Sequence, residues 1–206
     1  MSSSLWLGFL AASIVIAVTP GPGAVASMST GLRHGYWSAL ALILGLQSAI
    51  LFQLAIVGLG LGALLATSES AFEAVKYVGV AYLVWLGIQK WRAPPADLEA
   101  SPVPRRRHGL YLQGLMVNLT NPKAIIFIAA LVPQFVDPLA PQVPQYLLIA
   151  LTLCGTDTLV MSCYALAAAR VGRWLHDPRA QRVQNRFFGT LFVAAGTLLA
   201  FSRQPH

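Results

Sequence analysis

The sequence predicts an all-α integral membrane protein, whose six transmembrane helices form two inverted three-helix repeats with the first and fourth helices broken. Of the 206 residues, 56% are hydrophobic and only 10% are charged, whereas a soluble domain of this size needs more charge on its surface. Six apolar segments approach the ~20 residues that cross a bilayer. Proline interrupts two of them at matching places in the two halves of the chain.

The six apolar segments take up most of the chain, so we treat residues 1–206 as a single transmembrane domain. The segments are Leu5–Met28, Trp37–Ala66, Ala71–Trp91, Leu110–Phe135, Gln145–Ala169 and Phe187–Ser202. The residues before the first segment, Met1–Ser4, carry no positively charged side chain. Because further spans follow, we interpret the first segment as a retained helix and not as a signal peptide.

The formal net charge of +7 comes mainly from Lys and Arg residues that gather in three of the loops. Cytoplasmic loops carry an excess of Lys and Arg, so these three loops are predicted to be cytoplasmic. The other two loops carry Glu69 and Asp137 and no Lys or Arg. This alternation places both termini in the periplasm of a bacterium, with the chain in the inner membrane, and it requires no nucleic-acid partner.

The longest polar stretch, about residues 93–108, is rich in proline and contains Arg105–Arg107. It is too short and too charged to pack a core, so it is predicted to be a cytoplasmic linker. The linker separates repeat one (about 1–92) from repeat two (about 109–206). Because three spans precede it, the second repeat enters the membrane in the opposite orientation, as in transporters built from inverted repeats.

The first and fourth spans are broken by Thr19–Gly23 and by Thr120–Lys123. Proline removes a backbone donor and clashes with the preceding turn, so a membrane helix needs local support at such a place. The helices that begin after Pro22 and Pro122 would present free amides and the positive end of their dipoles, which suit a carboxylate. The alternative is that the prolines only kink the helices for packing.

The second and fifth spans also carry polar residues at corresponding places, Gly45–Gln47 and Gly155–Asp157. At about 1.5 Å per helical residue, Gln47, Lys123 and Asp157 lie about 18–23 Å from the polar ends of their spans. That depth is near the midplane of a hydrocarbon layer about 30 Å thick. Spans one, two, four and five are therefore expected to share one polar layer.

Asp157 and Lys123 are the two charged residues of this layer. A carboxylate at this depth costs at least a few kcal/mol and usually lines a cavity or pairs with another group. Asp157 could carry a proton or hold a substrate ammonium as its surroundings change. Lys123 could pair with Asp157 at rest and then exchange it for a substrate carboxylate. The alternatives are a purely structural pair, or a lysine that extends toward the membrane surface.

Gln47, Asn118, Thr120 and Asn121 could complete the polar lining. Each side chain could equally make an interhelical hydrogen bond that contributes about 1 kcal/mol to helix packing.

The sequence shows no sign of an enzyme. Its histidines all fall in predicted loops or in the tail; they are His34, His108, His176 and His206. The chain has no zinc-protease, nucleophile-elbow or phosphate-loop motif. We therefore expect no catalytic residue, no metal site and no cofactor.

Several motifs together resemble the LysE/RhtB family of bacterial amino-acid exporters, from about Leu5 to Ser202. They are Thr19–Gly23, His34–Tyr36, Gly45–Gln47, Ala81–Gly87, Asn118–Lys123 and Pro133–Phe135. The second and third spans are most similar to the homoserine/homoserine lactone efflux group of that family. The resemblance implies export of small amino acids or their lactones, driven by the proton gradient. Many relatives carry an ionisable residue in place of Gln47, which leaves Asp157 as the proton-coupling candidate.

We therefore predict a secondary active, proton-coupled exporter of homoserine, homoserine lactone and threonine that works as a homodimer in the lipid bilayer. A passive channel or a cation exporter is the main alternative, and a membrane enzyme or a scaffold is the other. The candidate substrate-binding residues are Thr19, Pro20, Gly21, Pro22, Gly23, Gln47, Asn118, Thr120, Asn121, Pro122, Lys123 and Asp157.

Overall fold

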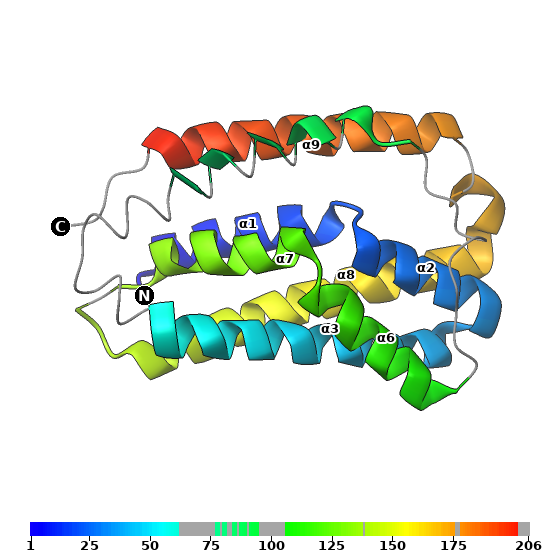
Figure 1. The fold of residues 1–206 in the computed structure, drawn as a ribbon, viewed down its shortest axis with the longest axis horizontal. Coiled ribbons are helices and arrows are strands. Elements are labelled where there is room, and N and C mark those ends of the chain that lie inside the picture. The colour runs from blue at the N-terminus through cyan, green and yellow to red at the C-terminus, as the bar shows by residue number, and fades with distance from the viewer. Residues whose placement is uncertain are drawn as a thin grey trace.

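The computed structural model describes residues 1–61, 77–78, 80–81, 84–85, 87–89, 91–94, 106–137, 139–175 and 178–201. Within these ranges every regular element is a helix and there is no strand. The predicted all-α class is thus confirmed for the described part of the chain (Figure 1).

The first predicted span is a pair of helices bent by 55°. Helix α1 covers Ser3–Val18 and helix α2 covers Pro22–His34. Gly21 precedes α2 in extended conformation, and Pro22 occupies the first helical turn, where its missing N–H removes no hydrogen bond within α2 itself. Helix α2 ends at Gly35, whose φ of 76° is a conformation that favours glycine.

The fourth predicted span is a second bent pair, also with a bend of 55°. Helix α6 covers Arg107–Leu119 and helix α7 covers Pro122–Ile126. The chain continues through a π-helical turn, η2 (Phe127–Leu131), and a 3-10 turn, η3 (Val132–Phe135). This second pair runs in the opposite direction to the first (Figure 1).

Three further long helices lie within the described residues. Helix α3 covers Tyr36–Ile56 and continues as a π-helical turn, η1 (Val57–Leu61); α8 covers Gln142–Leu175; α9 covers Pro178–Phe201. Two segments, Tyr36–Gly60 and Gln142–Ala168, are long and apolar enough to cross a membrane, and up to four spans result if each bent pair is counted as one.

The third and sixth predicted spans are covered by the described residues to different extents. Most of Ala71–Trp91 lies outside the described residues. Phe187–Ser202 falls largely within α9, which begins at Pro178 and so extends further toward the N-terminus than predicted. The six-span count, the inverted repeat and the division of the chain at residues 93–108 therefore stay predictions.

Helices α3 and α6 cross at two glycines. A Cβ atom on Gly45 would overlap the Tyr111 carbonyl, and a Cβ atom on Gly114 would overlap the Leu42 carbonyl. Because both backbones meet without intervening side chains, the second span and the first half of the fourth are held close together.

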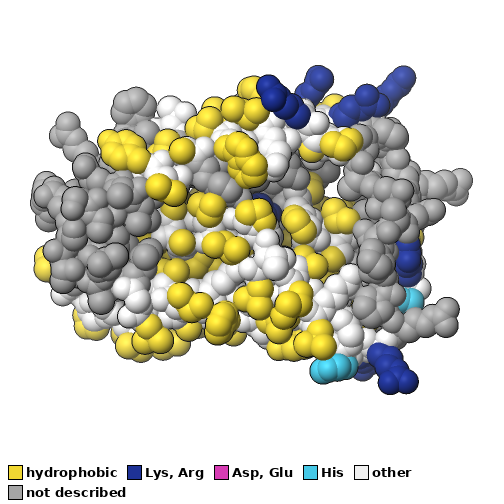
Figure 2. All heavy atoms as spheres, in the orientation of Figure 1, with side chains coloured by type: hydrophobic (Ala, Val, Ile, Leu, Met, Phe, Trp, Pro, Cys, Tyr) yellow, Lys and Arg dark blue, Asp and Glu magenta, His cyan; other side chains and the backbone are white. Residues whose placement is uncertain are grey.

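Apolar side chains cover the middle of the visible face, while Lys and Arg gather toward one end (Figure 2). The buried apolar residues form two clusters. One includes Phe9, Ile50 and Val132, and the other includes Met28, Leu42 and Leu110. Large exposed side chains such as Leu51 and Leu151 are what a helix facing lipid requires.

Candidate functional site

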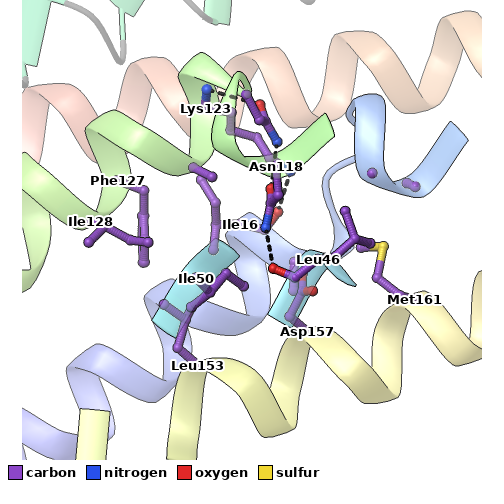
Figure 3. A pocket seen from close by; sticks show the side chains of 15 residues that line it. Ile16, Leu46, Ile50, Asn118, Lys123, Phe127, Ile128, Leu153, Asp157 and Met161 are labelled. Carbon is purple, nitrogen blue, oxygen red and sulfur yellow. Dashed lines mark hydrogen bonds between the residues drawn. The ribbon is translucent and has the colours of Figure 1, made fainter. Parts of the chain in front are cut away.

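A cavity lies where the two helix breaks meet. It is lined by helices α1, α2, α3, α6, α7 and α8 and by the turn η2 (Figure 3). The space that the centre of a water-sized sphere can occupy inside it is about 40 Å³. Since one buried water needs about 10–15 Å³ by this measure, the cavity has room for several non-hydrogen atoms. It draws its apolar wall from both clusters, through residues such as Ile50, Phe127 and Met161.

The first break is supported by two side chains that replace missing backbone donors. In a continuous helix the carbonyl of residue i accepts from the N–H of residue i+4, and proline has none. Pro20 would therefore leave the Ile16 carbonyl without a donor, and the Lys123 ammonium donates to it at 2.9 Å. Pro22 does the same to the Val18 carbonyl, which accepts from the Tyr164 hydroxyl at 2.6 Å.

Lys123 also donates to the Thr19 carbonyl at 2.8 Å. The carbonyls at the end of α1 carry the negative end of its dipole, so a cation is stabilised there. Lys123 on α7 thus bonds the second break directly to the first.

The second break shows the same arrangement. Pro122 removes the i+4 donor for the Asn118 carbonyl, which accepts instead from the Gln53 side-chain amide at 3.0 Å and from the Asn121 backbone N–H at 3.2 Å. The buried Asn118 side chain donates in turn to the Leu46 carbonyl at 3.0 Å and accepts from Asn121 at 3.2 Å. This network fixes the second break against α3.

The two helix starts differ in how their amides are used. At α7 the side chain of Asn121 accepts from the Lys123 amide at 3.1 Å. At α2 no side chain caps the first turn, and its residues Gly23 and Ala24 line the cavity. The positive end of the α2 dipole is therefore the better place for a carboxylate.

Asp157 accepts a hydrogen bond from the Gln47 side-chain amide at 2.8 Å. The Oε1 atom of Gln47 is buried and has no hydrogen-bond partner among the described residues. Lys123 interacts with Asp157 through its charge, and its ammonium donates hydrogen bonds to two carbonyls of the first break. In Figure 3 the labelled Asn118 lies between the labelled Lys123 and Asp157.

The cavity brings together some of the predicted site residues and not others. Those that line it are Gly23, Asn118, Asn121, Lys123 and Asp157. Gln47 does not line the cavity but donates a hydrogen bond to Asp157, and the Thr19 carbonyl accepts one from Lys123. Gly21 packs against the Lys123 side chain. The others lie outside the lining: Pro20 is partly exposed, and Pro22, Thr120 and Pro122 are exposed.

Gln53 and Tyr164 were not among the predicted site residues. A signal was available, because each carbonyl four residues before a proline needs a donor. Tyr164 also follows Asp157 by seven residues, which places both on one face of α8. The spacing alone does not say which side chain reaches which carbonyl.

Comparison with known proteins decides the family. A family model of LysE type translocators matches residues 14–203, nearly the whole chain and both breaks. The chain belongs to this family.

Individual relatives of this LysE type translocator cover almost all of it. It is 43% identical over 204 residues to the homoserine/homoserine lactone efflux protein of Salmonella typhimurium, with 98% of this chain and 99% of the relative covered. It is 40% identical to an uncharacterized membrane protein of Vibrio cholerae serotype O1, covering 98% and 100%. It is 31% identical to the leucine efflux protein of Klebsiella pneumoniae, covering 95% and 94%. No solved structure matches the chain.

Proposed function

We propose that this LysE type translocator is a secondary active exporter of small amino acids or their derivatives. The observation that carries the proposal is the cavity between the breaks, with acceptors from Gln47 and Asp157 and the uncapped start of α2 around it. A zwitterionic amino acid needs both kinds of group. The efflux activities named for its relatives favour homoserine or homoserine lactone as substrate, with leucine as the next candidate; we include threonine as a further small amino acid.

The substrate ammonium would bind the Gln47 Oε1 and the ionised Asp157. Each is an acceptor, and an ammonium has three donors to offer. The carboxylate would bind the first-turn amides of α2, and Lys123 would add a positive charge near it. A lactone has no free carboxylate, so its carbonyl would bind the same amides more weakly.

Proton coupling would follow from the pair formed by Asp157 and Gln47. With Asp157 ionised, Gln47 donates through its NH₂ group and keeps its oxygen free for the ammonium. With Asp157 protonated, the carboxylic acid would donate to that oxygen after the amide rotates, and the ammonium would lose both acceptors. The other titratable groups that interact with Asp157 are Lys123 on α7 and Cys154 on α8.

Asp157→Asn tests the proton-coupled role. We expect the variant to fold and to lose proton-driven homoserine efflux in vesicles, because asparagine keeps the shape and cannot exchange a proton in this range. Asp137→Asn makes the same change in a loop outside the cavity and should export normally. Proton-driven efflux by Asp157→Asn at the wild-type rate would contradict the proposal.

A passive channel or cation exporter would share the polar cavity. Counterflow of radiolabelled homoserine with no imposed gradient distinguishes a carrier, which exchanges substrate, from a channel, which does not. An enzyme or scaffold would leave homoserine and threonine tolerance of the cells unchanged on overexpression.

Orientation and assembly belong to the same proposal. The end of the molecule with Arg33, His34 and Arg107 would face the cytoplasm under the positive-inside rule, and the N-terminus lies at the other end (Figure 1). We propose the bacterial inner membrane as the location, both termini periplasmic, and a homodimer as the assembly. Light scattering of the detergent-solubilised protein measures its oligomeric state directly.

A further inference from the structure

Two hydroxyl groups of α2 are fully buried without a hydrogen-bond partner among the described residues. They belong to Ser27 and Thr30, both 0% exposed. Threonines in other helices of this chain donate to the carbonyl one turn earlier; they are Thr120, Thr152, Thr156, Thr190 and Thr197. Since a buried unsatisfied hydroxyl is destabilising and rare, Ser27 and Thr30 need an explanation.

Ser27 lies one turn before Gly31, on the face of α2 that packs against α8, and Thr30 is the residue immediately before Gly31. The two helices run in the same direction (Figure 1) and touch at Gly31, where a Cβ atom would overlap the Ala165 carbonyl. One turn earlier on each helix stand Ser27 and Met161. One turn before those stand Gly23 and Asp157, and both line the cavity together with Met161.

The seam formed by Gly23, Ser27, Thr30 and Gly31 therefore starts at the cavity and runs along α8. It leads toward the end of α2 that carries Arg33 and His34, the end proposed to face the cytoplasm. An exporter has to admit its substrate from that side. Along α2 and α8, the contact between Gly31 and Ala165 lies between the cavity-lining residues Gly23 and Asp157 and that end.

We propose that this seam is the cytoplasmic half of the export path for small zwitterionic amino acids. This rests on the proposed function. When α2 and α8 separate, Ser27 and Thr30 hydrogen-bond the substrate's charged groups or the water around them. When the helices close, the Gly31 contact shuts the path and the two hydroxyls lose their partners, as the structure shows them.

Cysteine accessibility tests the path. In a cysteine-free background (Cys154→Ala, Cys163→Ala), Ser27→Cys and Thr30→Cys are treated in inverted vesicles with a small cationic methanethiosulfonate. We expect both to react from the cytoplasmic side, at a rate that saturating homoserine changes several-fold, with loss of efflux. Ser29→Cys, about 200° around the helix from Ser27, should stay unreactive, and the exposed His34→Cys should react throughout. Reaction of His34→Cys alone under every condition would overturn the proposal.

Removal of the hydroxyls separates a path from a merely structural role. Ser27→Ala and Thr30→Val delete groups that have no partner in the closed state, so we expect unchanged or higher melting temperatures with efflux several-fold lower. Lower melting temperatures with normal efflux would overturn the proposal. Gly31→Ala should prevent closure, raising the reactivity of Ser27→Cys and abolishing efflux, whereas Gly155→Ala, with open space around it, should do neither.

A separate measurement, counterflow by the cysteine-free parent, tests the proposed function. If the cysteine-free parent moves no amino acid in counterflow, the proposed function fails. The reactivity of Ser27→Cys still decides whether the seam opens.

Discussion

At the scale of single residues, the prolines of the two breaks and the side chains that compensate for them form one system. Pro20, Pro22 and Pro122 each remove a donor, and Lys123, Tyr164 and Gln53 each supply one to the carbonyl concerned. The compensating side chains come from other helices. Each hydrogen bond lost at a proline is therefore replaced by one that joins two helices distant in the sequence.

The Tyr164 hydroxyl should matter for stability although it makes no predicted substrate contact. In Tyr164→Phe the Val18 carbonyl loses its donor, which costs about 1–3 kcal/mol for a buried group. Thermal unfolding in detergent measures the loss. Tyr111→Phe is the matched control, because Ser48, the partner of Tyr111, also donates to the Leu44 carbonyl. Equal melting temperatures for the two variants would contradict this role for Tyr164.

Gln47 should matter for substrate affinity. Gln47→Leu removes the donor to Asp157 and the free acceptor for the ammonium while keeping a similar size. A hydrogen bond to a charged group contributes about 1.5–3 kcal/mol, so the KM for homoserine efflux should rise about 10- to 150-fold. Gln134→Leu, a glutamine whose amide donates to the Ala130 carbonyl away from the cavity, should leave KM near wild type. An unchanged KM in Gln47→Leu would remove Gln47 from the site.

At the scale of elements, the two bent pairs share their construction and differ in one detail. Both bend by 55°, and both restart with proline in the first helical turn. Asn121 occupies an amide of α7, whereas no side chain caps α2. Two breaks of the same shape thus differ in that only the α2 start has no side-chain cap, which is why we propose the anion site there.

The crossing of α3 and α6 positions Gln47 and should not tolerate a side chain at Gly114. In Gly114→Ala the added Cβ atom would overlap the Leu42 carbonyl, and overpacking of this kind costs about 1–3 kcal/mol. The melting temperature should fall by about 2–12 °C. Gly155→Ala faces open space and should melt like the wild type. A stable Gly114→Ala protein would mean that the two helices separate at no cost.

At the scale of the whole molecule, the cavity lies between the two hydrophobic clusters. Ile16, Ile50 and Leu153 belong to one cluster, and Ala24, Leu46 and Met161 belong to the other. The cavity wall therefore contains side chains from both clusters. In the proposed exporter, the centre would open to one side and then to the other along this division.

Labelling of intact cells tests the orientation of the molecule. In the cysteine-free background, Ser3→Cys and His34→Cys place single exposed thiols at opposite ends of the first bent pair. A membrane-impermeant maleimide should label Ser3→Cys in intact cells and His34→Cys only after permeabilisation, as the positive-inside rule predicts. The reverse pattern would invert the molecule and turn the proposed cytoplasmic path toward the periplasm.

The sequence by itself determined the all-helical class and the positions of the two breaks, and it predicts a common depth for Gln47, Lys123 and Asp157. These features depend on local properties, namely the length of apolar runs, the missing N–H of proline and the rise of a helix. Asn118 and Asn121 could be expected in the cavity for the same reason, since they adjoin a break.

Only the tertiary structure decided which side chains meet. It bonds Asp157 to Gln47, directs Lys123 to the carbonyls of α1, and brings in Gln53 and Tyr164. It also leaves Thr120 outside, donating to its own helix. Depth along a helix follows from counting residues, but facing depends on how each helix is rotated and crossed. Those rotations are set by contacts such as Gly45 with α6 and Gly31 with α8, which no single segment contains.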